Sequence, residues 1–426
     1  MCAHIDAGKV GLQGKAGEMA GLRRINQEDL RNHNLSVTLD TLLRARRPMS
    51  RADLAKETGL TKATMSLLAS MLLDGNVIEE GEPVVLTTYG RPSTPLKVRG
   101  GTIAGIGLQI NTDGYGCLAL DLNGDTLGRE WVSADMTDTD PYEIFAKLDA
   151  MTFPLESRLK RRGCKVVGAG LALPGIVTDD MWLLVARNLG WENVNLTRFN
   201  VVRRLDVVAG NEAKMAAIAQ IPGYATERAA FLNVVDRMDS FVYLSTDIGI
   251  GGAVVRDGEV VTGSHGFAGE VGHLSVAMDG PLCRCGRHGC LESFAGRRAL
   301  VEAAGIATDE EATSSEAIDK FLQRWRSGDP QVAKVVDRAV DALVSAIASA
   351  VNMVDVDTVL LGGLWTHFGD ELANVLESRL RSEILGYPNV KIRVFVPPVA
   401  EHPSLYGAAE MGLRRFIDNP LAYIAQ

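Results

Sequence analysis

Apolar residues recur with a helical period in the first quarter of the chain. Four leucines fall on one face of a predicted helix: Leu35, Leu39, Leu42 and Leu43. Ser50 then precedes a second predicted helix over residues 51–58, where its hydroxyl group can cap the first turn. Gly59 follows that helix and allows the chain to turn tightly. The pattern therefore predicts two helices followed by a bend.

A third helix is predicted to run from a cap at Thr61 to about Leu73. Its packed stripe consists of Met65, Leu68 and Leu72. The polar residues that this packing leaves available to phosphates and base edges are Thr61, Lys62, Thr64 and Ser66. This spacing is typical of a helix-turn-helix. The alternative is a three-helix protein-interaction module with a solvated polar face.

Two strand-like runs after the third helix, 77–80 and 84–86, predict a two-stranded wing. Gly90-Arg91-Pro92 follows and places Arg91 on a loop beside the wing. An arginine there can enter a narrow A·T-rich minor groove. Helix, turn, helix and wing in this order predict a winged helix-turn-helix DNA-binding domain over residues 34–98.

From residue 100 onward, strand-like runs alternate with helical patterns, which indicates an α/β architecture. The predicted strands are 102–110, 116–122, 126–133, 165–173, 229–235, 240–245, 252–255 and 358–361. Long helices are predicted over 142–161 and 331–353. Two similar α/β halves are implied. Ligand sites in such folds lie where strands end and the halves meet.

Composition and charge restrict the classes of protein to consider. The 426 residues carry a net charge of -9, yet residues 1–97 hold 13 Lys and Arg against 11 Asp and Glu. The acidic charge therefore lies in the remainder, and we expect nucleic-acid contact only at the N-terminal end. No apolar run suits a membrane span, and no signal peptide is evident. Three of the six cysteines lie in one cluster, which argues against a disulfide framework, so these features together predict a cytoplasmic protein. Residues 1–33 are expected to form a flexible arm or leading helix.

Four soft ligands lie close together between residues 273 and 290: His273, Cys283, Cys285 and Cys290. Zinc favours tetrahedral thiolate and imidazole coordination, so the sequence predicts a structural Zn²⁺ site. Gly286 and Gly289 relieve the steric cost of bending a short chain around an ion. His288 is a rival fourth ligand, and free thiols in a cytosolic loop are the other alternative.

Polar clusters are expected at the cleft. Asn211 and Glu212 follow a strand-like run over 206–209 and suit a pair of sugar hydroxyl groups, although a helix start of this kind also serves ordinary capping. Glu270 and Glu292 flank the predicted zinc ligands and can bind adjacent hydroxyl groups; surface salt bridges are the alternative. The glycine loop 246–252 is a weak phosphate signal, because Asp247 would repel an anion there.

These residues together resemble the ROK family of repressors and sugar kinases over nearly the whole chain from about Asn34. The matching motifs include Gly90-Arg91-Pro92, Leu173-Pro174-Gly175, Asn211-Glu212-Ala213, Ile248-Gly249-Ile250-Gly251-Gly252, Glu270-Val271-Gly272-His273 and the cysteine cluster with Glu292. The resemblance implies an actin-like ATPase (ribonuclease H-like) domain of two lobes over 99–426. It also implies a sugar pocket lined by Asn211, Glu212, Glu270, His273 and Glu292, beside zinc held by His273, Cys283, Cys285 and Cys290.

Two departures from the family's kinases bear on activity. Where the kinases have an Asp-x-Gly-Gly-Thr phosphate loop, this chain reads Gly107-Leu108-Gln109-Ile110-Asn111. Side chains would then meet a nucleotide phosphate in place of backbone donors. The kinases' catalytic aspartate is replaced by Glu212, and a misplaced base can cost about 10²-fold in rate. We therefore expect no kinase activity.

The sequence thus predicts a sugar-responsive transcriptional regulator, most simply a repressor of carbohydrate-metabolism genes. Its expected partners are operator DNA and a monosaccharide or sugar-derivative effector, and a homodimer or homotetramer would match half-sites. The alternatives are an ATP-dependent sugar kinase that also binds DNA, and a regulator whose effector is a partner protein. Which sugar binds, and whether it releases or promotes DNA binding, stay open at this stage.

Overall fold

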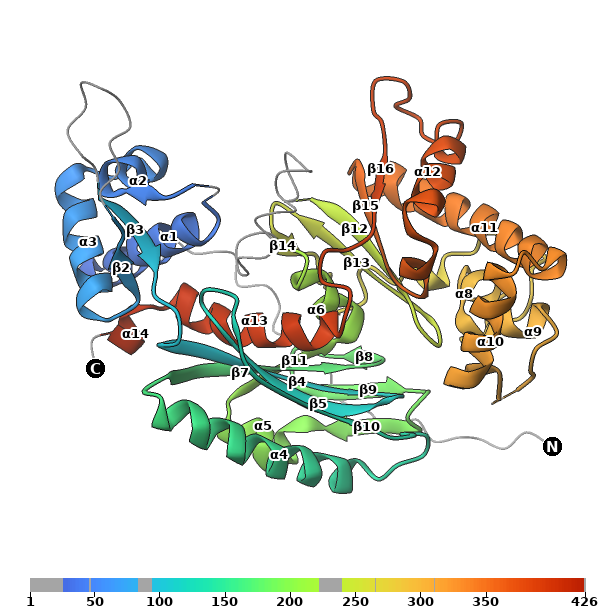
Figure 1. The fold of residues 1–426 in the computed structure, drawn as a ribbon, viewed down its shortest axis with the longest axis horizontal. Coiled ribbons are helices and arrows are strands. Elements are labelled where there is room, and N and C mark those ends of the chain that lie inside the picture. Colours follow the sequence, from blue (N-terminus) through green and yellow to red (C-terminus); the bar gives the residue numbers. More distant parts are fainter. Residues whose placement is uncertain are drawn as a thin grey trace, which may run out of the picture.

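The computed structural model describes residues 26–45, 47–82, 94–221, 240–264, 266–309 and 311–424. It is elongated, with a small N-terminal unit, here called the head (residues 26–98), at one end and a helical cluster at the other (Figure 1). Two α/β lobes lie beyond the head, as the alternating pattern predicts. No described helix is long and apolar enough to cross a membrane.

The head consists of three helices and a three-stranded antiparallel sheet. Its elements are α1 (Gln27–Leu43), β1 (Met49–Ser50), α2 (Arg51–Thr58), α3 (Lys62–Asp74), β2 (Ile78–Glu80) and β3 (Pro95–Val98). The side chains of Ser50 and Thr61 cap α2 and α3 as predicted, and Gly59 ends α2 with a φ of 70°. The predicted apolar stripes of α1 and α3 are buried apart from Leu43, which is partly buried.

The wing differs in part from its prediction. The described strand that pairs with β2 is β3, and the sheet has the order β1-β3-β2. The predicted strand 84–86 and Arg91 lie outside the described residues. Helix α1 also begins at Gln27, inside the segment 1–33 that was expected to be an arm or leading helix, because Asn26 and Asp29 form a capping box there.

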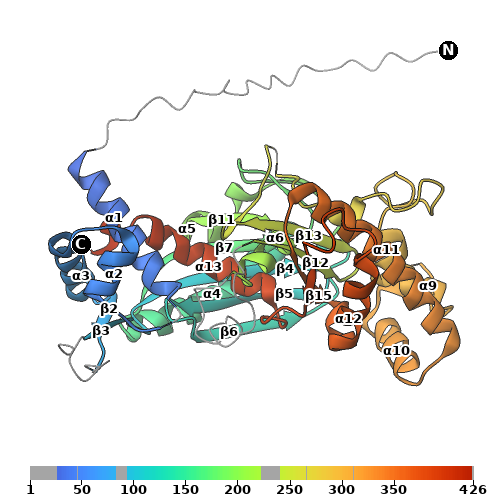
Figure 2. The same ribbon diagram turned by 90° about the horizontal axis from the view of Figure 1, so that it is seen from above.

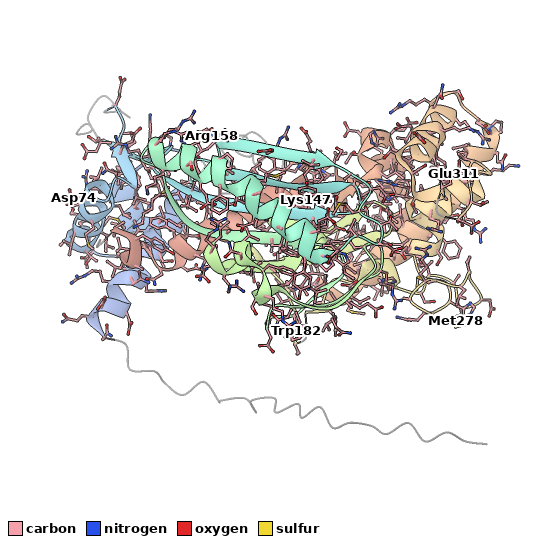
Figure 3. All side chains as sticks on the ribbon, turned by 90° about the horizontal axis from the view of Figure 1, so that it is seen from below. Asp74, Lys147, Arg158, Trp182, Met278 and Glu311 are labelled. Atoms are coloured by element: carbon pink, nitrogen blue, oxygen red, sulfur yellow. The ribbon has the colours of Figure 1, made fainter. Side chains whose placement is uncertain are left out.

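Lobe 1 is built on a five-stranded sheet of order β11-β7-β4-β5-β6. Its strands are β4 (Ile103–Asn111), β5 (Gly114–Asp121), β6 (Thr126–Ser133), β7 (Lys165–Leu173) and β11 (Val207–Asn211). Helix α4 (Pro141–Arg161) covers one face, as Figure 3 shows by the positions of Lys147 and Arg158. Smaller elements complete the lobe: β8 (Ile176–Val177), β9 (Trp182–Ala186), β10 (Trp191–Asn195) and α5 (Asn200–Arg204). Short α6 (Glu212–Ile218) follows β11.

Lobe 2 has a second five-stranded sheet, of order β14-β13-β12-β15-β16. Its strands are β12 (Phe241–Thr246), β13 (Ile250–Arg256), β14 (Glu259–Val260), β15 (Thr358–Gly363) and β16 (Arg393–Phe395). Its helices are α8 (Glu292–Ala295), α9 (Arg297–Ala303), α10 (Ser315–Arg326), α11 (Pro330–Val354) and α12 (Gly369–Leu380). The predicted strands 240–245, 252–255 and 358–361 are confirmed, and 229–235 lies outside the described residues.

Helix α13 (Pro403–Asp418) lies along the other face of the lobe 1 sheet and reaches the head (Figures 1 and 2). Its backbone touches the strands directly, because a Cβ atom on Gly107 would meet the Leu405 carbonyl oxygen at 2.1 Å, and one on Gly105 the Ala409 oxygen at 2.2 Å. Leu405, Leu413 and Phe416 then share one hydrophobic core with the head. Together with α14 (Leu421–Ile424), α13 joins the head to lobe 1.

Candidate functional site

A cleft of about 1030 Å³ opens between the two lobes, where several strands end. All five residues predicted to bind a sugar line it: Asn211, Glu212, Glu270, His273 and Glu292. They come from distant parts of the chain: the first two from the end of β11 and the start of α6, Glu270 and His273 from the segment between β14 and α8, and Glu292 from the first residue of α8. The structure therefore brings together residues separated by up to 81 positions in sequence.

The four predicted metal ligands also converge. The candidate ligand atoms of His273, Cys283, Cys285 and Cys290 all lie within 4.8 Å of one another. The Nδ1 atom of His273 is 3.8 Å from Cys283 Sγ, and the Sγ atoms of Cys285 and Cys290 are 3.7 Å apart. Sulfurs bound tetrahedrally at about 2.3 Å would lie roughly 3.8 Å apart, so these spacings fit a four-coordinate metal ion.

Local backbone geometry explains how the cluster forms. Gly286 and Gly289 have φ values of 89° and 70°, which L side chains rarely adopt. A Cβ atom on Gly289 would also meet the Ala277 carbonyl oxygen at 1.6 Å. The rival ligand His288 is exposed, and its Nδ1 atom lies 3.1 Å from the Gly280 carbonyl oxygen, outside the convergent group.

Glu292 connects the candidate metal site to the glycine loop. Its Oε2 atom accepts a hydrogen bond of 3.1 Å from the Ile250 amide, and its Oε1 atom lies 3.8 Å from Cys283 Sγ. Gly249 leaves room for this contact, because a Cβ atom there would meet Oε2 at 2.2 Å. Glu292 therefore occupies space directly against a loop that would otherwise present its backbone to a phosphate.

Asn211 has a structural role in addition to its place on the cleft. Its Oδ1 atom accepts from the amides of Ala213 and Lys214 and caps α6, while Nδ2 donates to the Gly175 carbonyl oxygen at 2.9 Å. Asn211 therefore does serve as an ordinary helix cap, the alternative role that its place in the sequence allows. The same bonds orient the side chain at the cleft wall, with one amide hydrogen left to donate.

Carboxylates dominate the electrostatics of the cleft. Burial, together with the nearby charges of Asp247 and Asp113, raises the pKa of Glu212 to about 8. The pKa of Asp247 is also raised by burial, although its ion pair with Arg297 opposes this shift. Burial likewise raises the pKa of Glu270, against the lowering effect of His273 and Lys214. An anionic ligand would meet repulsion on this side of the cleft.

Two ionic features were not found by the sequence reasoning. Lys214 on α6 is buried, and its Nζ atom donates to the Gly266 carbonyl oxygen at 2.5 Å, while burial lowers its pKa. Arg297 pairs with Asp247 of the glycine loop and donates to the Thr313 carbonyl oxygen. Lys214 lies two residues after Glu212, in the first turn of the helix that begins there. This closeness to the Asn211-Glu212 motif was the signal in the sequence that could have placed Lys214 near the cleft.

On the head, the four described residues predicted to contact DNA lie at the start of α3. Thr61, Lys62 and Ser66 are exposed, and Thr64 is partly exposed. All three hydroxyl groups already have local partners: Thr61 Oγ1 lies 2.9 Å from Thr64 Oγ1, and Ser66 Oγ donates to the Lys62 carbonyl oxygen at 2.9 Å. Lys62 is the cation of this group.

Comparison with known proteins agrees with this geometry. The sequence profile of the ROK family matches residues 106–415. The chain belongs to the ROK family. A putative xylose repressor of Caldicellulosiruptor sp. (strain Rt8B.4) is 30% identical over 397 residues, which cover 87% of this chain and 93% of that protein. The xylose repressor of Caldicellulosiruptor bescii is 27% identical, with the same two coverages.

Solved structures of the ROK family show the same fold. The crystal structure of a ROK family transcriptional regulator, a homologue of the E. coli MLC protein, has a TM-score of 0.72 at 22% identity and covers 93% of this chain and 99% of its own. A ROK glucokinase from Streptomyces griseus, crystallised with glucose and AMPPNP, has a TM-score of 0.59 at 23% identity and covers 73% and 99%. The predicted α/β class with an actin-like ATPase fold is confirmed.

Proposed function

We propose that this ROK protein is a sugar-responsive transcriptional repressor whose head binds operator DNA. The observation that carries the proposal is the presence in one chain of a head of three helices with a small sheet and of a polar cleft, with the head and lobe 1 joined through a common hydrophobic core. The similarity to xylose repressors over 87% of the chain supports it. The division into an arm or leading helix (1–33), a DNA-binding domain (34–98) and a sugar-binding domain (99–426) belongs to the same proposal.

In this proposal, α3 enters the major groove. Thr61, Lys62, Thr64 and Ser66 contact phosphates and base edges, and Arg91 contacts the minor groove. Two heads are needed for a pair of half-sites, so the working form is a homodimer or homotetramer. The exposed position of Lys62 and Ser66 supports the major-groove role.

The effector is proposed to be a monosaccharide or sugar derivative held by Asn211, Glu212, Glu270, His273 and Glu292. Zinc is proposed at His273, Cys283, Cys285 and Cys290, because thiolate and imidazole donors at these spacings suit its tetrahedral coordination. The ion would keep the loop that carries Glu270 and Glu292 in one shape. With Nδ1 of His273 turned to the thiols, its Nε2 atom is the nitrogen left for the sugar.

A contact path connects the cleft to the head. Pro403 and Ser404 at the start of α13 line the cleft, and Ser404 Oγ donates to the Glu212 carbonyl oxygen at 2.9 Å. At the far end, Arg414 Nη1 lies 3.3 Å from Asp40 of the head, and its Nη2 lies 3.2 Å from Glu259 of lobe 2. A sugar that moves one lobe against the other would therefore act on the head through α13.

The test is fluorescence anisotropy of the metal-loaded protein on a labelled duplex from its own upstream region, titrated with monosaccharides at fixed salt. We expect specific binding that one sugar alters. Glu270→Gln should abolish the sugar response and leave DNA affinity nearly unchanged, since Glu270 lines the cleft far from α3. Equal loss of both activities would contradict the proposed separation of sites.

The second candidate is a sugar kinase that also binds DNA. Its support is that Gly249, Gly251 and Gly363 line the same cleft, as nucleotide-contacting glycines would. The contact of Glu292 with this loop and the Asp247–Arg297 pair favour the repressor without catalysis. Incubation with ATP, Mg²⁺ and a panel of hexoses distinguishes the two, because sugar-dependent ADP release would establish the kinase.

A further inference from the structure

One buried polar side chain on the cleft has an atom without a hydrogen-bond partner. Gln109 lies near the end of β4, is only 4% exposed and lines the cleft. Its Oε1 atom has no hydrogen-bond partner among the described residues. Buried polar atoms are nearly always paired, and leaving one unpaired destabilises the folded state. This residue therefore calls for an explanation beyond packing.

The strand register explains why its side chain meets the cleft. Gly105, Gly107 and Gln109 are every second residue of β4, so they lie on the same face of the strand, the face that α13 covers. Ala409 of α13 packs on Gly105, and Leu405 packs on Gly107, so the helix advances by four residues for every two of the strand. The next step would fall at about residue 401, before α13 begins at Pro403. The N-terminal end of α13 therefore stops short of Gln109, and the helix backbone does not cover the long side chain of this residue.

The surrounding charges indicate what chemistry suits this amide. Asp113, Glu212 and Asp247 line the same cleft, and Arg297, which could attract an anion, is paired with Asp247. Arg187 and Arg284 are further cations on the cleft lining. A phosphate group placed here would be repelled by Asp113 and Asp247. A hydroxyl group can instead donate to an amide oxygen and accept from a protonated carboxyl group.

We propose that Gln109 is an effector-binding residue whose Oε1 atom accepts a hydrogen bond from a hydroxyl group of an unphosphorylated sugar. This inference rests on the proposed sugar-binding function of the cleft and adds to it a residue and a ligand class. Gln109 and the nearby carboxyl groups of the cleft together then select neutral sugars and exclude a phosphate ester of the same sugar.

The experiment measures two properties of Gln109→Met, which keeps the side-chain length and removes both polar atoms. Because the unpaired oxygen destabilises the ligand-free wild type, the melting temperature of Gln109→Met should be equal to or higher than that of the wild type. Its affinity for the sugar, by isothermal titration calorimetry, should fall by about 3- to 10-fold for one lost hydrogen bond. Operator affinity without sugar should not change.

Gln220→Met is the matched control. Gln220 is 1% exposed, but Nε2 donates to the Ala216 and Val399 carbonyl oxygens and Oε1 accepts from the Val399 amide. Its replacement should lower the melting temperature and leave sugar affinity unchanged. The same result for Gln109→Met would overturn the proposal, since it would show that Gln109 is structural and paired through water.

The phosphate arm uses the sugar that binds and its terminal phosphate ester. We expect the ester to bind at least 100-fold more weakly to the wild type. Equal or tighter binding of the ester would refute the ligand class while leaving the proposed regulator intact. If the wild type binds no sugar of the panel at all, the proposed function fails, and the role of Gln109 fails with it.

Discussion

At the scale of single residues, the cleft is governed by partly buried carboxyl groups that lie close to one another. Glu212 is the clearest case, because burial raises its pKa from 4.5 to about 8 and the charges of Asp247 and Asp113 act in the same direction. Around neutral pH its carboxyl group is therefore largely protonated and can donate a hydrogen bond to a sugar oxygen. An ordinary surface glutamate can only accept at this pH.

This shift predicts a pH dependence of stability. A carboxyl group whose pKa is higher in the folded state stabilises the fold below its unfolded pKa, and this contribution is lost as pH rises through the folded value. The ligand-free protein should therefore lose stability between about pH 4.5 and 8. Urea unfolding across this range should show a flatter profile for Glu212→Gln than for the wild type.

Glu371→Gln is the control, since Glu371 is an exposed residue of α12. Its profile should follow that of the wild type. A Glu212→Gln protein with the full wild-type slope would show that other groups carry the pH dependence.

At the scale of elements, the loop between β14 and α8 has little regular structure, and its shape depends on the four convergent ligands. Its described backbone hydrogen bonds are those of tight turns, such as the bond from the Gly286 amide to the Cys283 carbonyl oxygen, and of isolated bridges between Ser275 and Cys290 and between Leu282 and His288. Met278 and Leu282 are exposed on it, and Met278 marks its outer edge in Figure 3. A metal ion would supply the stabilisation that a hydrophobic core gives elsewhere.

Removal of the metal is therefore expected to loosen this loop and to weaken sugar binding by about 10-fold or more, because ligand-supporting contacts at metal sites have effects of this size. Operator affinity should persist. Elemental analysis before and after chelation should show one zinc per chain, and limited proteolysis should cut the loop only in the stripped protein. A Cys283→Ser protein should already behave as stripped; undiminished sugar affinity in it would contradict the prediction.

At the scale of the whole molecule, the head contacts both lobes. The head shares a hydrophobic core with lobe 1, and a charged junction links it to lobe 2: Arg44 pairs with Asp40, and Arg414 lies between Asp40 and Glu259. Figure 1 shows α13 running from the head across the lobe 1 sheet towards lobe 2. Relative movement of the lobes would change the distance between Arg414 and Glu259.

We expect Glu259→Gln to reduce the ratio of operator affinities measured without and with sugar. An exposed ion pair contributes about 0.2–1 kcal/mol, so the ratio should fall by a factor of roughly 1.5 to 5. Sugar affinity in the absence of DNA should change little, which calorimetry can check. A ratio equal to that of the wild type and of Glu371→Gln would remove the junction from the coupling path.

Much of the fold could be predicted from periodicity and capping. Helix α2 and strands β6 and β7 have the predicted bounds, because Ser50, Gly59 and clear runs of alternation mark their ends. Helix α13 was not predicted. Gly407 and Gly412 weaken its helical signal. The need for small residues comes from contact with other elements, because a Cβ atom on Gly407 would meet the Met215 carbonyl oxygen at 1.7 Å.

The sequence by itself determined the local chemistry: the ligand types and spacing of the metal cluster, the helix-turn-helix order, and the carboxylates of the cleft. These depend on residues close together in the chain or on recognisable motifs. Only the tertiary structure decided that Gln109 is buried with an unpaired oxygen, that Glu292 contacts the glycine loop, and that Arg414 joins three parts of the molecule. Such contacts join residues far apart in sequence, and their burial and charge environment arise only when the lobes, the head and α13 pack together.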